Sequence, residues 1–264
     1  TGSNKVRKLT FTGSTAVGKK LTADCAATMK RTSMELGGNA PFIIFGDADI
    51  PAAVNGLMAS KFRNSGQTCV CANRILVQAN IYDDFAKALQ IATEKLVVGD
   101  GMDPQTTIGP LIHSKAAHDT QTRLNQALED GAKIYWPAAI QDYEGSNFVQ
   151  PVILTDVKEQ MSICAEEIFA PIAPLVRFSD EADAIRLANN TQAGLAAYVY
   201  TNDTGQMIRV AESLEYGMVG INEGIISNEM APFGGVKESG NGREGSKYGL
   251  DDYLEIKYVC LGGL

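Results

Sequence analysis

The fold is decided by a continuous apolar run, Pro41-Phe42-Ile43-Ile44-Phe45, and a second strand-like run, Arg74-Ile75-Leu76-Val77-Gln78. Unbroken apolar runs of this length are typical of strands that are covered on both faces of a sheet. Between the two runs, Asp49 predicts the N-cap of a helix that carries a proline in its first turn and continues to about Asn64. A strand, a helix and a strand in this order predict a parallel pair of strands.

The same alternation extends along the whole chain. Further strands are expected at 6–11, 33–36, 132–136, 148–154, 172–178, 195–201 and 218–222, and further helices at 15–30, 81–96, 114–130, 180–190 and 203–215. This pattern predicts an α/β fold with a mostly parallel, doubly wound sheet, in which ligands bind at the carboxyl ends of the strands. Residues 223–250 predict a long loop. Asp252 to Leu261 alternates apolar and polar side chains and predicts a half-buried strand, either in the chain's own sheet or in that of a partner subunit.

Length and charge exclude several classes of protein. The 264 residues suit one large α/β domain, or one domain with a fragment of another. The net charge of −8 argues against nucleic acid and against anionic membranes as partners, because both require a basic face. No apolar run approaches the roughly 20 residues of a membrane span, and we expect no signal peptide.

Cysteine and histidine usage argues against disulfides and metals. The five cysteines are scattered, which is typical of a protein in the reducing cytoplasm. His113 and His118 lie five residues apart on a predicted helix, where they would not share a face, and no cysteine pair is near them. We therefore expect no metal site, and a base other than histidine for any cysteine nucleophile.

A cysteine loop follows the predicted helix and reads Phe62-Arg63-Asn64-Ser65-Gly66-Gln67-Thr68-Cys69-Val70-Cys71-Ala72-Asn73-Arg74. Two arginines bracket Cys69, and cationic neighbours together with backbone N–H groups favour the thiolate that a nucleophile requires. On this stretch alone, a second interpretation stays open, in which Cys69 packs as a small hydrophobic side chain. Cys71 would either form a strained, reducible disulfide with Cys69 or simply pack.

A carboxylate at the end of a predicted strand is a candidate general base. Glu35 lies between Met34 and Leu36, directly before the glycine pair Gly37-Gly38, which allows close backbone approach. Partial desolvation between two apolar neighbours would raise the pKa of Glu35 toward the range of a general base. The alternative is a strand-end glutamate that faces solvent.

Three further motifs have two interpretations each. The turn Gly13-Ser14-Thr15-Ala16-Val17-Gly18 would either present helix N–H groups to a phosphate or cap a helix. Glu167 would accept hydrogen bonds from ribose hydroxyls while Phe169 packs on a flat ring, or Phe169 would pack against a helix end. The run Gly240-Asn241-Gly242-Arg243-Glu244-Gly245 matches G-x-G-x-x-G, but no strand precedes it, so we interpret it as a tight turn.

Taken together, these motifs resemble the aldehyde dehydrogenase superfamily over essentially the whole chain. The resemblance is carried by five ordered motifs: Phe11-Thr12-Gly13-Ser14 with Gly18, Glu35-Leu36-Gly37-Gly38, Gly66-Gln67-Thr68-Cys69, Glu167-Ile168-Phe169 and Pro232-Phe233-Gly234-Gly235. The loop around Cys69-Val70-Cys71, Asn222-Glu223-Gly224, Gly245-Ser246-Lys247-Tyr248-Gly249 and Lys257-Tyr258-Val259 look like the succinate-semialdehyde dehydrogenase branch.

The resemblance implies a two-stage reaction on a small aldehyde. Cys69 would attack the aldehyde and form a thiohemiacetal, which passes a hydride to NAD or NADP, and Glu35 would activate the water that releases the acid. The backbone N–H of Cys69 would donate to the oxyanion. The branch also implies that Arg63 and Ser227 bind the far carboxylate of the substrate. The cofactor would contact Gly13, Ser14, Gly18, Leu36, Glu167 and Phe169.

Compared with the family, the chain begins near the end of the coenzyme domain. We therefore expect a remnant of the NAD(P)-binding domain at 1–35, a catalytic domain at 36–235, and a crossing loop with an oligomerisation strand at 236–264. We also expect a homo-oligomer and little or no turnover by these residues alone. The alternatives are an inactive fragment that acts as a folded oligomerisation module, and a dehydrogenase of another semialdehyde such as glutarate semialdehyde.

Overall fold

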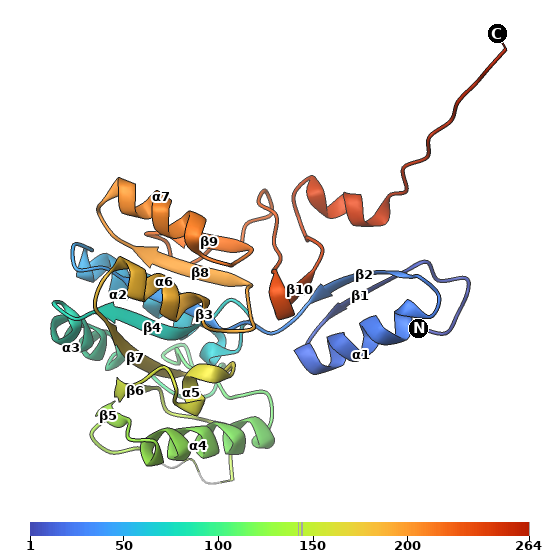
Figure 1. Cartoon of the computed structure of the whole chain (residues 1–264). Coiled ribbons are helices and arrows are strands. Elements are labelled where there is room, and N and C mark those ends of the chain that lie inside the picture. The colour runs from blue at the N-terminus through green and yellow to red at the C-terminus, as the bar shows by residue number, and fades with distance from the viewer. Residues whose placement is uncertain (142, 144, 264) are drawn as a thin grey trace.

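Two β-sheets organise the chain, as Figure 1 shows for the computed structural model, which describes residues 1–141, 143 and 145–263. In that part of the chain, the larger sheet has seven strands in the order β5 (Lys133–Trp136), β6 (Val152–Val157), β7 (Ile172–Phe178), β4 (Ala72–Gln78), β3 (Ala40–Ile44), β8 (Ala196–Tyr200) and β9 (Met218–Ile221). Neighbouring strands are parallel except for the antiparallel pair β5 and β6. The mostly parallel α/β sheet predicted from the sequence is confirmed.

Helices cover both faces of the larger sheet. One face packs against α2 (Ile50–Lys61) and α3 (Tyr82–Thr93), and the other against α4 (Ser114–Glu129), α5 (Ser162–Ala165), α6 (Glu181–Asn189) and α7 (Thr204–Ser213). Alternate side chains of β3 explain this arrangement, because Phe42 and Ile44 belong to the α2–α3 core whereas Ile43 belongs to the opposite core. Helix α2 begins as predicted: the Asp49 side chain accepts a hydrogen bond from the Ala52 N–H at 3.0 Å.

A smaller sheet contains β1 (Lys8–Thr12), β2 (Arg31–Glu35) and β10 (Gly240–Asn241). Strands β1 and β2 are parallel, and β10 pairs antiparallel with the end of β2. Short 3₁₀ turns complete the chain at η1 (Arg63–Gly66), η2 (Lys237–Ser239) and η3 (Tyr248–Tyr253). The G-x-G-x-x-G match therefore begins as a strand paired with the end of β2, so its interpretation as a tight turn is wrong for Gly240 and Asn241.

Helix α1 (Thr15–Ala26) is shorter than the helix predicted to reach about residue 30. Met29 lies beyond its end with a φ of 51° and is 89 % exposed, so it does not extend the apolar face of the helix. Four-residue spacing of Val17, Leu21, Cys25 and Met29 predicted one apolar face. Cys25 is buried, but Val17 is 44 % exposed, so the spacing identified neither the whole buried face nor the end of the helix.

The segment Asp252 to Leu261 does not pair with either sheet of its own chain, so that alternative is wrong, whereas pairing with the sheet of a partner subunit stays a prediction. The Asp252 carboxylate accepts a hydrogen bond from the Ser33 hydroxyl at 2.8 Å, and the chain then leaves both sheets, as the red end in Figure 1 shows. The side chains of Ile256 and Tyr258 are 101 % and 86 % exposed. Alternating apolar residues give a segment the pattern of a strand, but a strand also needs an edge to pair with.

None of the helices in the described residues is long and apolar enough to cross a membrane. The five cysteines are free thiols; Cys25, Cys71 and Cys164 are buried, Cys69 is partly exposed and Cys260 is exposed.

Candidate active site

The candidate catalytic residues meet where the two sheets approach each other. Cys69 and Glu167 precede β4 and β7, and Gly38 precedes β3, so all three lie at the amino ends of neighbouring parallel strands. Glu35 is the last residue of β2 and lies at the carboxyl end of that strand. The expectation that ligands bind at the carboxyl ends of the strands of the larger sheet is therefore wrong for this cluster, which lies at the amino ends of those strands. The end of β2 in the smaller sheet contributes Glu35 from the opposite side of the cluster.

Two glycines make the close packing of this cluster possible. A Cβ atom on Gly38 would stand 2.2 Å from the carbonyl oxygen of Cys69, and the Gly38 N–H donates to Glu167 Oε1 at 3.1 Å. A Cβ atom on Gly37 would stand 2.9 Å from Glu167 Oε2 and 3.2 Å from Thr15 Oγ1. The glycine pair therefore allows backbone, thiol loop and carboxylate to meet, as expected from the sequence.

Glu35 is buried, with 5 % of its surface exposed. Burial raises its pKa to about 8; the carboxylate of Glu244 adds to the rise and the guanidinium of Arg243 opposes it. Neither carboxylate oxygen of Glu35 has a hydrogen-bond partner among the described residues. The prediction of a desolvated carboxylate is confirmed, and the alternative of a solvent-facing glutamate is wrong.

Cys69 has a raised pKa of about 11, so the prediction of a loop that favours the thiolate is wrong. Burial is the largest cause, followed by the carboxylates of Glu167 and Glu35, whereas the backbone N–H groups of Cys69 and Val70 lower the value. The backbone contribution thus has the predicted direction, but carboxylates, and not cations, are the charged groups that act on this sulfur.

The two arginines that bracket the cysteine do not neutralise these carboxylates. Arg63 is exposed, and Arg74 is only 4 % exposed. The Arg74 guanidinium donates to the carbonyl oxygens of Asn39, Leu187 and Ala188 at 3.0, 2.7 and 2.8 Å. These carbonyls belong to segments far away in the sequence, so the proximity of Arg74 to Cys69 along the chain does not place its charge at the sulfur.

Several residues predicted to contact a cofactor pack against Glu35 and its neighbour Leu36. The Gly13 N–H donates to the Glu35 carbonyl at 3.0 Å, and a Cβ atom on Gly18 would stand 2.3 Å from Leu36 Cδ2. Ser14 occupies the N-cap of α1, but its side chain makes no capping hydrogen bond. Of the two interpretations of this turn, side-chain capping by Ser14 is therefore wrong, and phosphate binding stays a prediction.

The Glu167 segment lies next to this turn. Burial raises the pKa of Glu167 to about 7, and the Gly38 N–H, Lys61 and Arg123 oppose the rise. Phe169 is 43 % exposed and has a φ of 53°, a left-handed conformation that is uncommon outside glycine. Its ring therefore does not pack into the core at the end of α5, and it is accessible to a ligand.

Comparison with known proteins agrees with this geometry. The aldehyde dehydrogenase family matches residues 1–259 of the chain. The chain belongs to the aldehyde dehydrogenase family. It is 59 % identical over 99 % of its length to a mitochondrial succinate-semialdehyde dehydrogenase of Arabidopsis thaliana, and 57 % identical over 99 % to an NADP(+) succinate-semialdehyde dehydrogenase of Escherichia coli.

Two further similarities bear on substrate and fold. A glutarate-semialdehyde dehydrogenase of Pseudomonas putida is 55 % identical over 99 % of the chain. A crystal structure of a succinate-semialdehyde dehydrogenase from Burkholderia pseudomallei is 54 % identical and has a TM-score of 0.97 over 100 % of the chain, covering 54 % of its own. The chain spans about half the length of the curated relatives it matches, 49 % and 54 % of the first two.

This aldehyde dehydrogenase family member also has a buried lysine that our reading of the sequence missed. Lys61, the last residue of α2, is 0 % exposed, and its Nζ has no hydrogen-bond partner in the described part of the chain. Burial lowers its pKa, while Cys71 and Glu167 raise it. The signal was available: Lys61 follows the buried Val54 and Leu57 at helical spacing, on the face of α2 that packs on the sheet.

A second missed feature fixes the Glu167 segment onto the strand ends. Asn73 Nδ2 donates to Asn39 Oδ1 at 2.7 Å and to the Glu166 carbonyl at 2.9 Å, and Asn73 Oδ1 accepts from the Ile168 N–H at 2.9 Å. Asn39 Nδ2 in turn donates to the Cys164 carbonyl at 3.0 Å. Because both amides are buried and fully used, they hold Glu167 in place beside Gly38.

The two residues expected to bind substrate are both exposed. Arg63 begins η1, before Asn64 and Ser65, whose φ angles are 51° and 56°. Ser227 lies in the loop after β9 and makes no hydrogen bond with any described residue. Their proposed roles thus depend on the family resemblance.

Proposed function

We propose that the protein oxidises a dicarboxylic semialdehyde, with succinate semialdehyde as the first candidate, to the corresponding carboxylic acid with NAD(P)+. The observation that carries this proposal is a partly exposed thiol, Cys69, near the buried carboxylate of Glu35, whose oxygens have no hydrogen-bond partner among the described residues. A carboxyl group with a pKa of about 8 is a stronger base than an ordinary carboxylate, and the fraction of Glu35 in the deprotonated form that a general base requires increases as the pH rises from 7 to 9.

In the proposed reaction, the Cys69 sulfur bonds to the aldehyde carbon, and the thiol proton passes to the Glu35 carboxylate. The Cys69 backbone N–H, which lowers the thiol pKa in the free chain, donates to the oxygen that becomes negative. Bound NAD(P)+ supplies the hydride acceptor that converts the thiohemiacetal into a thioester. Glu35 releases the thiol proton to solvent and, as a carboxylate again, takes a proton from a water molecule, whose oxygen attacks the thioester carbon. The carbon–sulfur bond then breaks, the acid is released, and the proton on Glu35 returns to the Cys69 sulfur.

The residues present fit one end of a nicotinamide dinucleotide. Glu167 Oε2 and Thr15 Oγ1 lie 2.9 and 3.2 Å from the position that a Cβ atom on Gly37 would take, so the missing side chain lets these two polar groups approach the Gly37 backbone. The Ser14 hydroxyl, unused in capping, lies at the N-terminus of the twelve-residue helix α1. We propose that Glu167 holds ribose hydroxyls, that Phe169 contacts the nicotinamide side, and that the phosphates approach Gly13 and Ser14.

Substrate choice is proposed to depend on Arg63 and Ser227. The planar guanidinium of an arginine binds a carboxylate with two parallel hydrogen bonds, and the serine hydroxyl would add a donor. Glutarate semialdehyde is a second candidate substrate, because an arginine that binds the far carboxylate does not by itself select the length of the substrate. The glutarate-semialdehyde dehydrogenase of Pseudomonas putida is 55 % identical to this chain.

The experiment that tests this proposal is protection of Cys69 from alkylation. Iodoacetamide labels thiols, and peptide mapping resolves Cys69 from the exposed Cys260, which serves as an internal control. Succinate semialdehyde should slow labelling of Cys69 and leave Cys260 unchanged, whereas succinate, which has no aldehyde, should protect neither. Equal labelling of Cys69 with and without the semialdehyde would contradict the proposal.

The same assay tests the substrate residues. Butyraldehyde lacks the far carboxylate, so in the wild-type chain it should protect Cys69 at higher concentrations than succinate semialdehyde does. Arg63→Gln should bring the two aldehydes to similar protecting concentrations, whereas the control Arg209→Gln, on the surface of α7 and paired with Glu181, should not. An unchanged preference in Arg63→Gln would show that Arg63 does not read the carboxylate.

For assembly and turnover, we propose the domain division 1–35, 36–235 and 236–264, a cytoplasmic homo-oligomer, and little or no turnover by these 264 residues alone. Support for the oligomer comes from the apolar terminal segment, which is exposed in the single chain. This feature also favours the alternative of an oligomerisation module without activity. Sedimentation at several concentrations, with and without residues 254–264, tests assembly, and NADPH absorbance with succinate semialdehyde tests turnover.

A further inference from the structure

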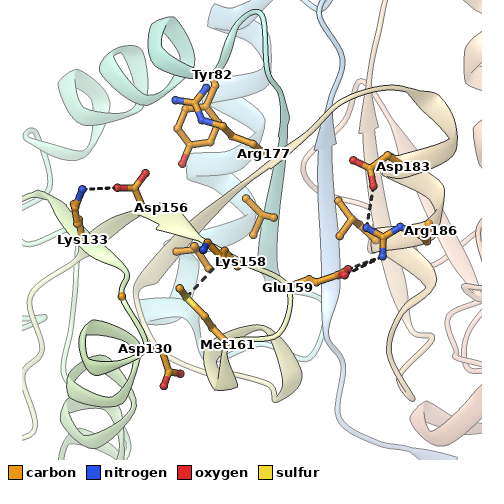
Figure 2. A pocket seen from close by; sticks show the side chains of 14 residues that line it. Tyr82, Asp130, Lys133, Asp156, Lys158, Glu159, Met161, Arg177, Asp183 and Arg186 are labelled. Atoms are coloured by element: carbon orange, nitrogen blue, oxygen red, sulfur yellow. Dashed lines mark hydrogen bonds and ion pairs between the residues drawn. The ribbon is translucent and has the colours of Figure 1, made fainter.

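A cavity of about 580 Å³ lies beside β6, β7 and α6, and no residue of the Cys69 cluster lines it. Figure 2 shows its charged side chains in pairs, with Lys133 beside Asp156 and Arg186 beside both Glu159 and Asp183. The lining holds four carboxylates and four cations, so no excess charge is left to bind a ligand. This cavity therefore does not indicate a second ligand site.

The turn between Arg63 and Cys69 has an unusual backbone. Asn64, Ser65 and Gly66 follow one another with φ angles of 51°, 56° and 78°, all in the left-handed region. Glycine adopts this region freely, asparagine less readily, and serine only at a cost in free energy. The turn does not keep this conformation through its own preference, so contacts from elsewhere in the chain must hold it.

Two side chains join this turn to a distant segment. The Ser65 hydroxyl donates to the Gly109 carbonyl at 2.8 Å. Gln67 Oε1, directly after the turn, accepts from the Ile112 N–H at 2.9 Å, and Gln67 Nε2 donates back to the Asn64 carbonyl at 3.1 Å. Both connections reach the same short stretch of backbone, 44 and 45 residues further along the chain.

That stretch, residues 108–112, is anchored in both cores of the larger sheet. Ile108 is buried in the core beneath α2 and α3, whereas Leu111 is buried in the opposite core. The Leu111 N–H also donates to the Asn147 carbonyl at 2.8 Å. The residues that contact the turn lie between and directly after these anchors. We call residues 108–112 the bracing segment, because it ties the turn to both layers of the fold.

The turn also packs against the segment that carries Glu167. A Cβ atom on Gly66 would stand 2.4 Å from the Ala170 carbonyl oxygen, so only glycine allows this approach. The turn is thus held between two segments that are far from it in the sequence. Its backbone fixes where Arg63 and Cys69, which lie before and after it, leave the turn.

These two residues are the ones that the proposed function assigns to opposite ends of the substrate. The Arg63 guanidinium opposes the rise in the pKa of the buried Cys71 thiol, so its charge acts on the cysteine loop. We propose that Ser65 and Gln67 are positioning residues, which lock the turn against the bracing segment and set the distance from this charge to Cys69. A semialdehyde is held at both ends, so this distance selects its length. The selection of length rests on the proposed function, whereas the placement of Cys69 does not.

The first measurement uses the whole chain without any aldehyde and follows the alkylation of Cys69 by iodoacetamide against pH. Burial and the carboxylates of Glu167 and Glu35 raise the pKa of this thiol to about 11. Gln67→Met removes both hydrogen bonds of the side chain, so the sulfur should lie farther from these groups and its pKa should fall toward the ordinary value of 9.0. Alkylation at pH 8 should then be about fivefold faster or more, and Ser65→Ala should act in the same direction.

Further variants separate positioning from a general loss of structure. Gln67→Glu keeps an oxygen that accepts from the Ile112 N–H, so alkylation should not become faster than in the wild type. Gln121→Met, at an exposed glutamine of α4 that is bonded to Asn125, should leave the rate unchanged. In every variant the buried Cys25 should stay unlabelled, which shows that the chain is folded.

The second measurement compares semialdehydes of different length as protectants of Cys69. In the wild type, the protecting concentrations of succinate semialdehyde and glutarate semialdehyde should differ about tenfold or more, because one methylene group in a fixed site changes binding by this factor. Gln67→Met should bring the two concentrations close together, whereas Gln67→Glu and Gln121→Met should keep the difference.

The two measurements distinguish this proposal from the proposed function. If neither semialdehyde protects wild-type Cys69 but Gln67→Met still speeds alkylation, the proposed function and the selection of length fail, and the placement of Cys69 by the turn stands. Wild-type alkylation rates in both Gln67→Met and Ser65→Ala would overturn the positioning role. Equal protection of the wild type by the two semialdehydes would overturn the selection of length.

Discussion

The carboxylate of Glu35 raises the pKa of the Cys69 thiol, although Glu35 ends a strand of the smaller sheet and Cys69 precedes β4 of the larger sheet. The candidate base and the candidate nucleophile therefore oppose each other's ionisation in the free chain.

This relationship predicts the behaviour of Glu35→Gln. The change removes one of the two carboxylates that raise the thiol pKa, so Cys69 should be alkylated by iodoacetamide about two- to fivefold faster at pH 9 than in the wild type. Glu244→Gln is the matched control, because Glu244 acts on Glu35 and is not among the groups that raise the Cys69 pKa. Slower alkylation in Glu35→Gln would show that the carboxylate helps to ionise the thiol.

The stability of the chain should depend on pH through the same glutamate. Between the ordinary pKa of 4.5 and the folded value of about 8, the folded chain holds a proton on Glu35 that the unfolded chain has released. The free energy of unfolding should therefore fall as the pH rises through this window, by on the order of 4 kcal/mol from this group.

Urea unfolding at pH 5 and pH 9 measures this effect. Glu35→Gln should reduce the difference between the two pH values, because its amide does not ionise, and should leave the contribution of Glu167, whose pKa is also raised. The exposed Glu229 offers a control, since Glu229→Gln should keep the wild-type difference. A pH dependence that survives unchanged in Glu35→Gln would contradict a buried, protonated Glu35.

Local patterns in the sequence predicted the strands and helices of the larger sheet and the burial of Glu35, one of the two candidate catalytic residues. The apolar run at 41–45 and the N-cap at Asp49 involve neighbours in the chain, so strand and helix followed from them. Glu35 was predicted as desolvated because its immediate neighbours Met34 and Leu36 are apolar, and both are buried. Features that depend only on nearby residues can be read before the fold is known.

Features that depend on distant segments were missed or misjudged. Arg74 lies near Cys69 in sequence, but its guanidinium donates hydrogen bonds to the carbonyl oxygens of Leu187 and Ala188. The terminal alternation at 252–261 specifies a strand but not the edge it pairs with. The position of β4 between β7 and β3 in the larger sheet was not predicted either, because strand order is not encoded in any local pattern.

The buried Lys61 should cost stability at neutral pH. Its amine lies in a fully buried position without a hydrogen bond in the described residues, and burial lowers its pKa. Lys61→Met keeps the volume and removes the amine, so the free energy of unfolding at pH 7 should rise by roughly 1–3 kcal/mol. The gain should shrink as the pH approaches 10.5, because the unfolded chain then no longer binds the extra proton.

The control for this change is Lys61→Ala, which also removes the amine but leaves a cavity under α2. It should be less stable than Lys61→Met by about 2 kcal/mol or more in the same urea titration. If Lys61→Met proves less stable than the wild type, the amine has a stabilising partner, and the Cys71 thiol beside it would be the first candidate.

Cys69 and Cys71 should form a reversible disulfide under mild oxidation. Only one residue separates them, and a bridge across so short a loop is strained and easily reduced. Diamide, which takes two electrons and two protons from the thiols, should lower the mass of the peptide that contains both by about two units. Dithiothreitol should restore it, and Cys71→Ser should leave Cys69 open to alkylation after diamide. Unchanged alkylation of Cys69 in the wild type after diamide would indicate that Cys71 forms no disulfide and has only a packing role. Its thiol donates weak hydrogen bonds to the carbonyl oxygens of Lys61 and Ala72.

The last prediction concerns the glycine that separates Glu167 from the thiol loop. In Gly38→Ala the added methyl group would meet the Cys69 carbonyl oxygen at 2.2 Å, and this backbone atom cannot move without displacing the nucleophile. The free energy of unfolding should fall by about 2–3 kcal/mol, and succinate semialdehyde should no longer protect Cys69. Gly101→Ala is the matched control, because nothing lies within 4 Å of its Cβ position, and it should keep both stability and protection. Wild-type protection in Gly38→Ala would mean that the reactive thiol does not depend on the close approach of these two segments.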